Sequence, residues 1–218
     1  MKKIDWLNHL FNFTAVILGV FLAFYVSDRA EKRKEKQELK IIVESLIEDL
    51  KSDQSTYLDY QLPVNRKHAG DIAELLEAIL NEELDRINAY MSELLTLDNY
   101  SPNSTTYLSS TTTGKLTLIE DLETKKMLSA YFDVQAAEVQ KRGEIQTDFF
   151  LDDLLPWLTQ NTNLGDMDPK SLVGDQLLLN KLVIYQSFIT NKIQGYEELV
   201  AFGAELIVEL EAILADLK

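Results

Sequence analysis

The feature that most constrains this chain is an apolar segment near its N-terminus that ends abruptly in a charged run. No charged side chain occurs from Leu10 to Val26, whereas most residues of the run that follows are charged. At 1.5 Å per residue, about 17 to 20 helical residues extend roughly 26–30 Å, close to the hydrocarbon thickness of a bilayer. Trp6 and Tyr25 lie near the two ends, where amphipathic rings favour the membrane interface. We therefore predict a transmembrane helix over residues 10–26.

Two alternatives to a membrane span are open on sequence grounds. A secretory signal would need a shorter apolar region and a small-residue cleavage site, whereas Tyr25, Val26 and Ser27 lead directly into the charged run. A buried helix of a soluble core is the second alternative. The length of the apolar run, which matches a bilayer, favours the span over both.

Charges on either side of the predicted span indicate its orientation. Lys2 and Lys3 lie in the N-terminal flank, residues 1–9, and many more basic residues follow the span. Because the positive-inside rule counts Lys and Arg near the span, we expect a span in the inner (plasma) membrane of the cell, with the N-terminus outside and residues 28–218 in the cytoplasm. A basic cluster beside the span would also contact anionic lipid headgroups. It consists of Arg29, Lys32, Arg33, Lys34 and Lys36.

One face of the predicted span is suited to contact with another helix. Small residues allow two backbones to approach closely, and an Asn side chain can form a hydrogen bond across the interface. Gly and Ala are also common in spans that do not associate, so self-association is a hypothesis. At 100° per residue, the residues of this face fall within roughly an 80° sector. They are Asn8, Asn12, Ala15, Gly19 and Ala23.

The remaining residues show the periodicity of long helices. Apolar residues recur at spacings of three and four from Leu39 to Tyr57, so we expect a rod over about residues 5–60 that ends before Pro63. Its residues 27–62 form a basic juxtamembrane stem. Its apolar stripe fits a short coiled coil or one helix of a bundle, and we favour the bundle because the heptad run is short.

Residues 63–218 are predicted to form an acidic helical bundle. Amphipathic helices are expected at residues 72–79 and 84–95, and a longer helix should begin at the N-cap Asp121 and end at Pro156. No strand-like alternation has comparable strength. The fold class is therefore all-α, with a transmembrane helix that continues into a stem and then a cytoplasmic bundle of long antiparallel helices.

The final helix, expected from about Asp175 to Leu217, has the clearest periodicity. Its apolar residues form a seam with alternating steps of three and four over about three heptads. Gly203 occupies one seam position. We expect this notch to admit a partner backbone or a large side chain.

Composition restricts the chemistry and the partners. The net charge is −15, and residues 1–40 carry eight Lys or Arg against five Asp or Glu, so the acidity lies in the bundle. Such a body repels phosphate backbones, and we expect no nucleic acid partner. With no Cys and only two His, the chain offers no thiolate nucleophile, no zinc ligand set and no evident base for a nucleophile. We expect no cofactor, no metal and no enzymatic activity.

Two polar segments are candidates for a binding site. The loop 160–176 carries Asp166, Asp168 and Asp175, but it lacks the residue order of a calcium loop, so turn and capping roles are preferred. The Ser/Thr-rich stretch before Gly114, a predicted helix C-cap, could line a polar pocket, and local capping is the simpler alternative. The residues of that possible pocket are Thr106, Tyr107, Ser110, Thr111 and Lys115.

Two stretches resemble a known family. "AVILGVFLAFYVSDRAEKRKEKQELKIIVESLIEDLKSD" is similar to an opening in which an apolar span leads into Asn/Glu-Arg-Lys and then Leu-Leu-x-Asp-Leu. "TTYLSSTTTGKLTLIEDLETKKMLSAYF" is similar to a Thr-Tyr, Ser-Gly-x-Leu and Ile…Leu…Tyr-Tyr pattern, matched by Thr106, Tyr107, Gly114, Leu116, Ile119, Leu128 and Tyr131. The family resembled is an uncharacterised one of small bacterial single-span membrane-anchored helical proteins. Leu108, Thr113, Thr124 and Phe132 depart from its pattern.

The resemblance implies the topology and an all-α architecture, and it implies no reaction because the family has no established activity. The residues and the resemblance together favour a single-pass, homo-oligomeric membrane protein. Its bundle would act as a non-enzymatic interaction or sensor module for an unknown protein or small ligand.

Two alternative functions are open. The first is a ligand-gated effector that perturbs the membrane, or whose copies arrange Asn12 around a pore. An anchored hydrolase that uses carboxylates is the second, and no motif supports it.

Overall fold

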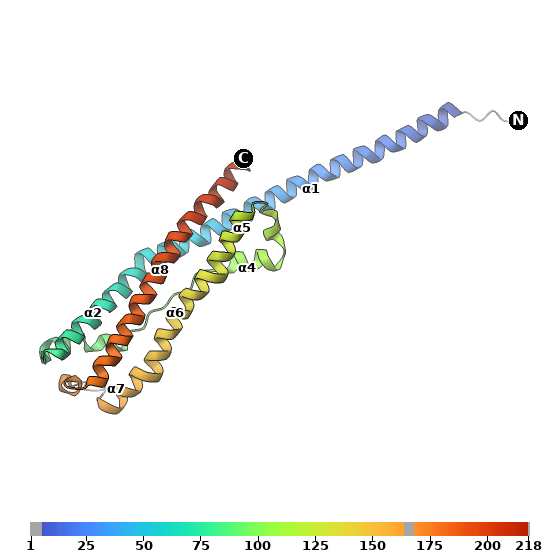
Figure 1. Cartoon of the computed structure of the whole chain (residues 1–218). Coiled ribbons are helices and arrows are strands. Elements are labelled where there is room, and N and C mark those ends of the chain that lie inside the picture. The colour runs from blue at the N-terminus through green and yellow to red at the C-terminus, as the bar shows by residue number, and fades with distance from the viewer. Residues whose placement is uncertain (1–5, 164–167, 218) are drawn as a thin grey trace.

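The long first helix dominates the computed structural model, which describes residues 6–163 and 168–217, with side chains from Leu10 onward (Figure 1). This described part is built of helices joined by loops and contains no strand, so the predicted all-α class is confirmed. Helix α1, Trp6–Thr56, projects far beyond the others, and its second half enters a bundle in which α8 contacts α1, α2 and α6. Helix α8 runs back toward the projecting part of α1.

The elements that follow α1 have these bounds: η1 Tyr57–Gln61, α2 Leu62–Leu80, α3 Leu84–Tyr90, η2 Met91–Leu95, α4 Thr105–Thr112, η3 Lys115–Leu118, α5 Leu122–Ser129, η4 Ala130–Gln135, α6 Ala136–Phe149, η5 Phe150–Leu154, α7 Leu155–Asn161, η6 Pro169–Leu172 and α8 Gln176–Asp216. The segments η1, η4 and η5 are π-helical, and η2, η3 and η6 are 3₁₀ helices.

Two helices continue through a proline at which we expected them to end. The first helix passes through Pro63 to Leu80, so the predicted end near residue 60 is wrong. In the π-helical turn before Pro63, the N–H of Leu62 donates to the carbonyl of Tyr57, five residues earlier. This wider turn, with the proline in the first turn of α2, reduces the clash and the lost hydrogen bond that proline causes inside a helix.

The second case has the same construction. Segment η5 precedes Pro156, and the N–H of Leu155 donates to the carbonyl of Phe150. Helix α7 then continues to Asn161, so the predicted end at Pro156 is also wrong. In both helices a π-helical turn ends two residues before the proline.

The bundle contains two apolar cores that meet near the middle of α8. The first lies between the second half of α1, α4, the α5–α6 helix and the C-terminal half of α8, and includes Val43, Leu46, Leu50, Leu128, Tyr131, Leu199 and Leu206. The second lies between α2, α3, α7 and the N-terminal half of α8, and includes Ile72, Leu75, Ile87, Leu154, Leu158, Leu178 and Leu182. Ile193 packs against both cores.

The seam of α8 is longer than the sequence analysis predicted. Buried residues recur at alternating steps of four and three from Leu178 to Leu210, and Lys192 occupies one of these positions. Gly203 leaves the expected notch, which the ring of Tyr131 fills, because a Cβ added to Gly203 would lie 3.1 Å from Cε2 of that ring. The occupant is therefore a large side chain of the same chain.

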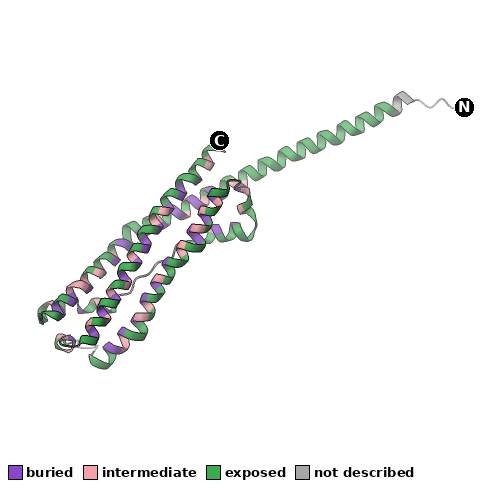
Figure 2. Cartoon of the chain, viewed as in Figure 1, coloured by how far each residue is buried: buried purple, intermediate pink, exposed green. Residues whose placement is uncertain are grey.

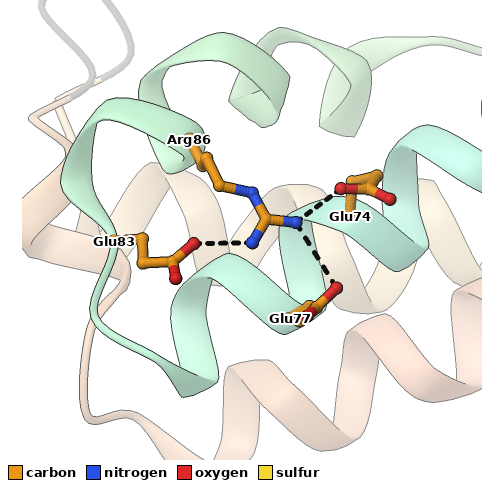
Figure 3. A network of polar contacts seen from close by, with 4 residues as sticks. All are labelled: Glu74, Glu77, Glu83 and Arg86. Carbon is orange, nitrogen blue, oxygen red and sulfur yellow. Dashed lines mark hydrogen bonds and ion pairs between the residues drawn. The ribbon is translucent and has the colours of Figure 1, made fainter.

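The far end of the bundle is closed by ion pairs around Arg86 (Figure 3). Its Nη1 donates to Glu83 at 2.6 Å, and its Nη2 lies 2.5 Å from Glu74 and 3.4 Å from Glu77. These carboxylates come from α2 and the turn before α3, so one guanidinium joins the two helices. Hydrogen bonds to Glu83 and Glu74 raise the pKa of Arg86 above its ordinary value.

The apolar segment from Leu10 to Val26 packs against nothing else in the described chain (Figure 2). All of the side chains in this segment are exposed, and none of its most apolar part is buried. A buried helix of a soluble core is therefore excluded. The helix that contains this segment is the one helix in the described residues that is long and apolar enough to cross a membrane.

Replacement of Gly203 by Leu should destabilise the bundle by about 1–3 kcal/mol, because the new side chain has to displace the ring of Tyr131. The matched control is Gly70→Ala in α2, where an added Cβ meets nothing within 4 Å. That change should stabilise the bundle by about 0.5–1 kcal/mol through helix propensity. Urea unfolding of the full chain, followed by far-UV circular dichroism, measures both. Equal effects of the two changes would contradict this account of the seam.

Candidate functional site

An extended segment crosses the bundle where the two cores meet. Residues Thr96–Ser104, here called the strap, join η2 to α4 and lie outside the helices and 3₁₀ segments of the described chain. Figure 1 shows the strap as the thin coil that leads along the bundle to α4. Main-chain N–H and C=O groups without a helix partner need hydrogen bonds from elsewhere when they are buried. Side chains of the surrounding helices supply several of them.

Lys192 of α8 binds the strap from inside the bundle. Its Nζ donates to the carbonyl of Asp98 at 2.6 Å and to Oδ1 of Asn99 at 2.8 Å. The side chain is fully buried. Burial lowers the pKa of Lys192 from 10.5 to about 8, and the nearby carboxylate of Asp98 opposes this shift.

Asp53 of α1 binds the other end of the strap. Its carboxylate accepts hydrogen bonds from the hydroxyl of Tyr100 at 2.8 Å and from the main-chain N–H of Asn103 at 3.0 and 3.1 Å. Asp53 is fully buried, and burial raises its pKa above the ordinary value although these hydrogen bonds oppose the change. A buried carboxylate from α1 therefore fixes the point where the strap turns into α4.

Two tyrosines of α8 complete the attachment. The hydroxyl of Tyr185 donates to the carbonyl of Thr96 at 2.9 Å, and the hydroxyl of Tyr196 accepts from the N–H of Tyr100 at 3.1 Å. The ring of Tyr57 packs edge-on against Tyr100, with their centroids 5.1 Å apart. Residues from α1, η1 and α8 thus converge on one short segment.

The layer around the strap is not fully satisfied. Four buried polar atoms have no hydrogen-bond partner among the described residues, and three of them lie near the strap: the hydroxyl of Tyr57, Oδ1 of Asn65 and Oε1 of Gln146. Each such group costs about 1–3 kcal/mol when it is left unpaired away from water. These atoms distinguish the polar layer from the two apolar cores on either side of it.

The residues around the strap do not form a recognisable catalytic set. His68 shares a hydrogen bond of 3.0 Å with the carbonyl of Glu93, and burial lowers its pKa. Within the described part of the chain, no group of three or more His, Asp or Glu side chains could hold a metal ion. Lys192 and Asp53 bind a main-chain segment of the same chain.

The residues of the possible polar pocket lie on α4 and η3. Tyr107 and Ser110 are buried, and the ring of Tyr107 stacks on Phe132 with centroids 4.6 Å apart. The Thr111 hydroxyl donates to the carbonyl of Tyr107 at 2.9 Å, which is local capping of the kind named as the simpler alternative. A ligand pocket at this place stays a prediction.

The other two residues of that set face α1. The N–H of Thr106 donates to the carboxylate of Asp49 at 3.4 Å, and Nζ of Lys115 lies 3.4 Å from Glu38. Gly114, which lies between the end of α4 and Lys115, has a φ of +72°, so it forms the predicted left-handed cap.

The aspartates of the late loop have capping roles where the structure describes them. Asp168 accepts from the N–H of Lys170 at 3.0 Å, and Asp175 accepts from the N–H of Leu178 at 2.8 Å at the start of α8. Asp121 caps α5 in the same way, as predicted. Asp166 lies outside the described residues.

The residues predicted to face lipid or another helix are exposed on α1. Asn12, Ala15, Gly19 and Ala23 are uncovered, and a Cβ added to Gly19 would meet nothing within 4 Å. The side chain of Asn8 lies outside the described residues. All members of the basic cluster, Arg29, Lys32, Arg33, Lys34 and Lys36, are exposed.

The comparison with protein families places the chain. A model described as a family of unknown function, DUF6090, matches residues 12–146, from the apolar segment through the strap and α4 into α6. The chain belongs to the DUF6090 family. The match includes both stretches on which the resemblance to an uncharacterised family was based, and that resemblance is confirmed. No curated protein and no solved structure matches the chain.

The DUF6090 match includes Asp53 and the strap but ends before α8, which supplies Lys192. Sequence analysis named neither Asp53 nor Lys192. A signal for Lys192 was present, since it stands four residues before Tyr196 in the repeat of the α8 seam. A charged residue at a seam position indicates either a polar contact in the core or the end of the seam.

Replacement of Asp53 by Leu should lower the free energy of unfolding by about 2–4 kcal/mol, because it leaves the N–H of Asn103 and the hydroxyl of Tyr100 without their acceptor. Asp53→Asn keeps one side-chain oxygen as a hydrogen-bond acceptor, so it should lower the free energy of unfolding by about half as much. Urea unfolding of the full chain measures the difference. A Leu variant as stable as the Asn variant would show that these hydrogen bonds do not hold the strap.

Lys192 should make the stability depend on pH in the alkaline range. Between about pH 8 and 10.5 the unfolded chain binds a proton that the folded Lys192 lacks, so the free energy of unfolding rises with pH through this window. Over this window the free energy of unfolding of the wild type should rise by on the order of 3 kcal/mol more than that of the Lys192→Met variant. Urea unfolding at pH 7, 8, 9 and 10.5 measures the two slopes. Parallel slopes would contradict a depressed pKa at this residue.

Proposed function

We propose that this chain is a single-pass protein of a bacterial inner membrane, which self-associates through its first helix and carries a non-enzymatic interaction or sensor module in the cytoplasm. One observation carries the proposal. The apolar segment from Leu10 to Val26 is uncovered along its whole length, although the same helix is packed in the bundle from Ile42 onward. Water would be an unfavourable surrounding for so many apolar side chains, and lipid would be a favourable one.

The continuity of the helix supports a retained span over a cleaved signal. Helix α1 runs from Trp6 to Thr56 without interruption, so a signal cleavage site after Val26 would lie inside an unbroken helix. The excess of Lys and Arg after the span supports a cytoplasmic bundle.

Self-association is supported by the open face of the span. Ala15, Gly19 and Ala23 leave room along one side of α1, and nothing in the described chain occupies it. In lipid, close backbone packing and polar contacts hold helices together, because lipid tails give no hydrophobic drive between them.

A sensor role is supported by the strap. Its attachments come from both α1 and α8, and the layer beneath it contains a buried lysine, a buried carboxylate and unpaired polar atoms. A segment held in this way can be released by a modest change in free energy, and release would expose the surface beneath it to a protein or small-ligand partner.

Replacement of Gly19 by Ile should weaken self-association in the membrane about tenfold or more, because the larger side chain separates the facing backbones. The matched control is Phe21→Ile, on the opposite side of the helix, which should leave association unchanged. Chemical crosslinking of the full-length protein in native membranes, after carbonate extraction, measures both insertion and copy number. Recovery of the intact chain in the soluble fraction, or a wild type that stays monomeric, would refute the proposal.

A gated membrane effector is a second candidate, and one observation favours it. Asn12 is exposed within the apolar segment on the same side as Gly19, so a polar amide would face either the neighbouring helices or an enclosed space. Ion flux across vesicles that contain the full-length protein tests this candidate. Flux in the wild type that Asn12→Leu abolishes would favour it over a purely associative span.

A further inference from the structure

The part of α1 between the apolar segment and the bundle carries charges of opposite sign on different sides. At 100° per residue, its charged side chains fall into two sectors of roughly 80–100° each, whose centres are about 130° apart. The basic stripe consists of Arg29, Lys32, Arg33, Lys36 and Lys40. The acidic stripe consists of Asp28, Glu31, Glu35 and Glu38. Lys34 is the one member of the basic cluster that lies outside the basic stripe. Its Nζ lies 4.0 Å from a carboxylate oxygen of Glu38.

Inside the bundle, the chain itself covers the continuation of both stripes. On the acidic side, Glu38 at the end of the stripe pairs with Lys115 at 3.4 Å where the bundle begins, and Asp53 inside the bundle accepts from the strap. On the basic side, Lys51 pairs with Glu211 of α8 at 2.7 Å. Each side of α1 therefore meets groups of opposite charge or hydrogen-bond donors where the chain folds against it.

Above the bundle the stripes have much less compensation. Lys32 pairs with Asp28 at 2.9 Å, and the guanidinium of Arg29 lies 5.0 Å from the ring centroid of Tyr25. Arg33 and Lys36 on one stripe, and Glu31 and Glu35 on the other, are exposed and form no ion pair in the described residues.

A membrane restricts how two copies of this helix can meet. A common span fixes the same direction and the same height for every copy, so side chains of equal residue number face each other at one level. Like stripes in contact would repel, whereas the basic stripe of one copy matches the acidic stripe of its neighbour at the same level. A lipid surface, in contrast, would suit only the basic stripe.

We propose that the exposed stem of α1, Ser27 to Lys40, is a docking surface for a second copy of this chain, with the basic stripe of each copy against the acidic stripe of the next. The proposal rests on the proposed self-association and adds a second contact along the stem, because the basic and acidic stripes lie about 90° and 140° around the helix from the small-residue face of the span. The pairing uses the charges that the single chain leaves unmatched, Arg33 and Lys36 on one side and Glu31 and Glu35 on the other.

Two matched double reversals test this pairing in the full-length chain. Arg33→Glu with Lys36→Glu makes the stem acidic on both sides, and Glu31→Lys with Glu35→Lys makes it basic on both sides. The control, Asp148→Lys with Asp152→Lys, reverses two exposed acids at the far end of the bundle. Because the chain has no Cys, Ser52→Cys on the exposed side of α1 gives a unique position for donor and acceptor dyes.

Energy transfer between labelled copies is measured in vesicles of neutral lipid at low salt. Each reversed variant alone should associate about tenfold more weakly than the wild type, because attractive pairs are lost and repulsive ones are formed. A mixture of the two variants should associate at least as well as the wild type, and the control should be unchanged. Added salt should weaken the wild type.

Three results would overturn the pairing. Wild-type transfer that neither reversal changes would show that the copies meet through the span alone, which leaves the proposed function intact. A loss in the acidic variant that requires anionic lipid would assign the basic stripe to headgroups. Absence of transfer in the wild type would remove the proposed self-association together with this inference. Circular dichroism of every variant shows whether the bundle is still folded.

Discussion

One unbroken helix connects the apolar segment to the interior of the bundle, and the rest of the structure is arranged around it. The run from Trp6 to Leu80 passes through the π-helical turn before Pro63 and supplies both the exposed segment and the buried Asp53. The distance along the axis from Val26 to Asp53 is about 40 Å at 1.5 Å per residue. The α-helix is continuous over this distance, and no proline or π-helical turn interrupts it between the two residues.

The strap shows what happens where the chain leaves helical geometry inside a bundle of helices. Its main-chain groups depend on side chains that come from distant parts of the sequence: Asp53, Lys192 and the two tyrosines of α8. Burial of a lysine and a carboxylate is costly unless each is well bonded, and here both are. Three of the four buried polar atoms that have no partner in the described chain lie in the same layer, between the two apolar cores.

Local signals in the sequence were reliable, whereas signals that depend on tertiary contacts were not. Gly114 in a left-handed conformation, the Asp121 cap and the extent of α8 follow from nearby residues, and all were predicted correctly. Pro63 and Pro156 were predicted to end helices because proline inside a helix loses a hydrogen bond and clashes with the preceding turn, whereas a π-helical turn precedes each of them. Lys192 occupies a position of the α8 seam, but the sequence around it gives no local sign that a lysine there is buried. The strap could not be located, since Asp53, Lys192 and the two tyrosines of α8 that hold it lie more than 40 residues away in the sequence.

The proposed self-association and the proposed sensor share a single element, which makes them one mechanical system. At 100° per residue, Asp53 falls on the same side of α1 as the acidic stripe of the stem. A neighbour docked on that stripe would fix the rotation of α1 about its axis, and the same rotation sets where the Asp53 carboxylate stands relative to the strap. Helix α1 stays packed in the first apolar core through Val43, Leu46 and Leu50, so the strap is one of several contacts that set this rotation. If docking favours the attached strap, linkage requires that a ligand preferring the released strap also favours the separated copies.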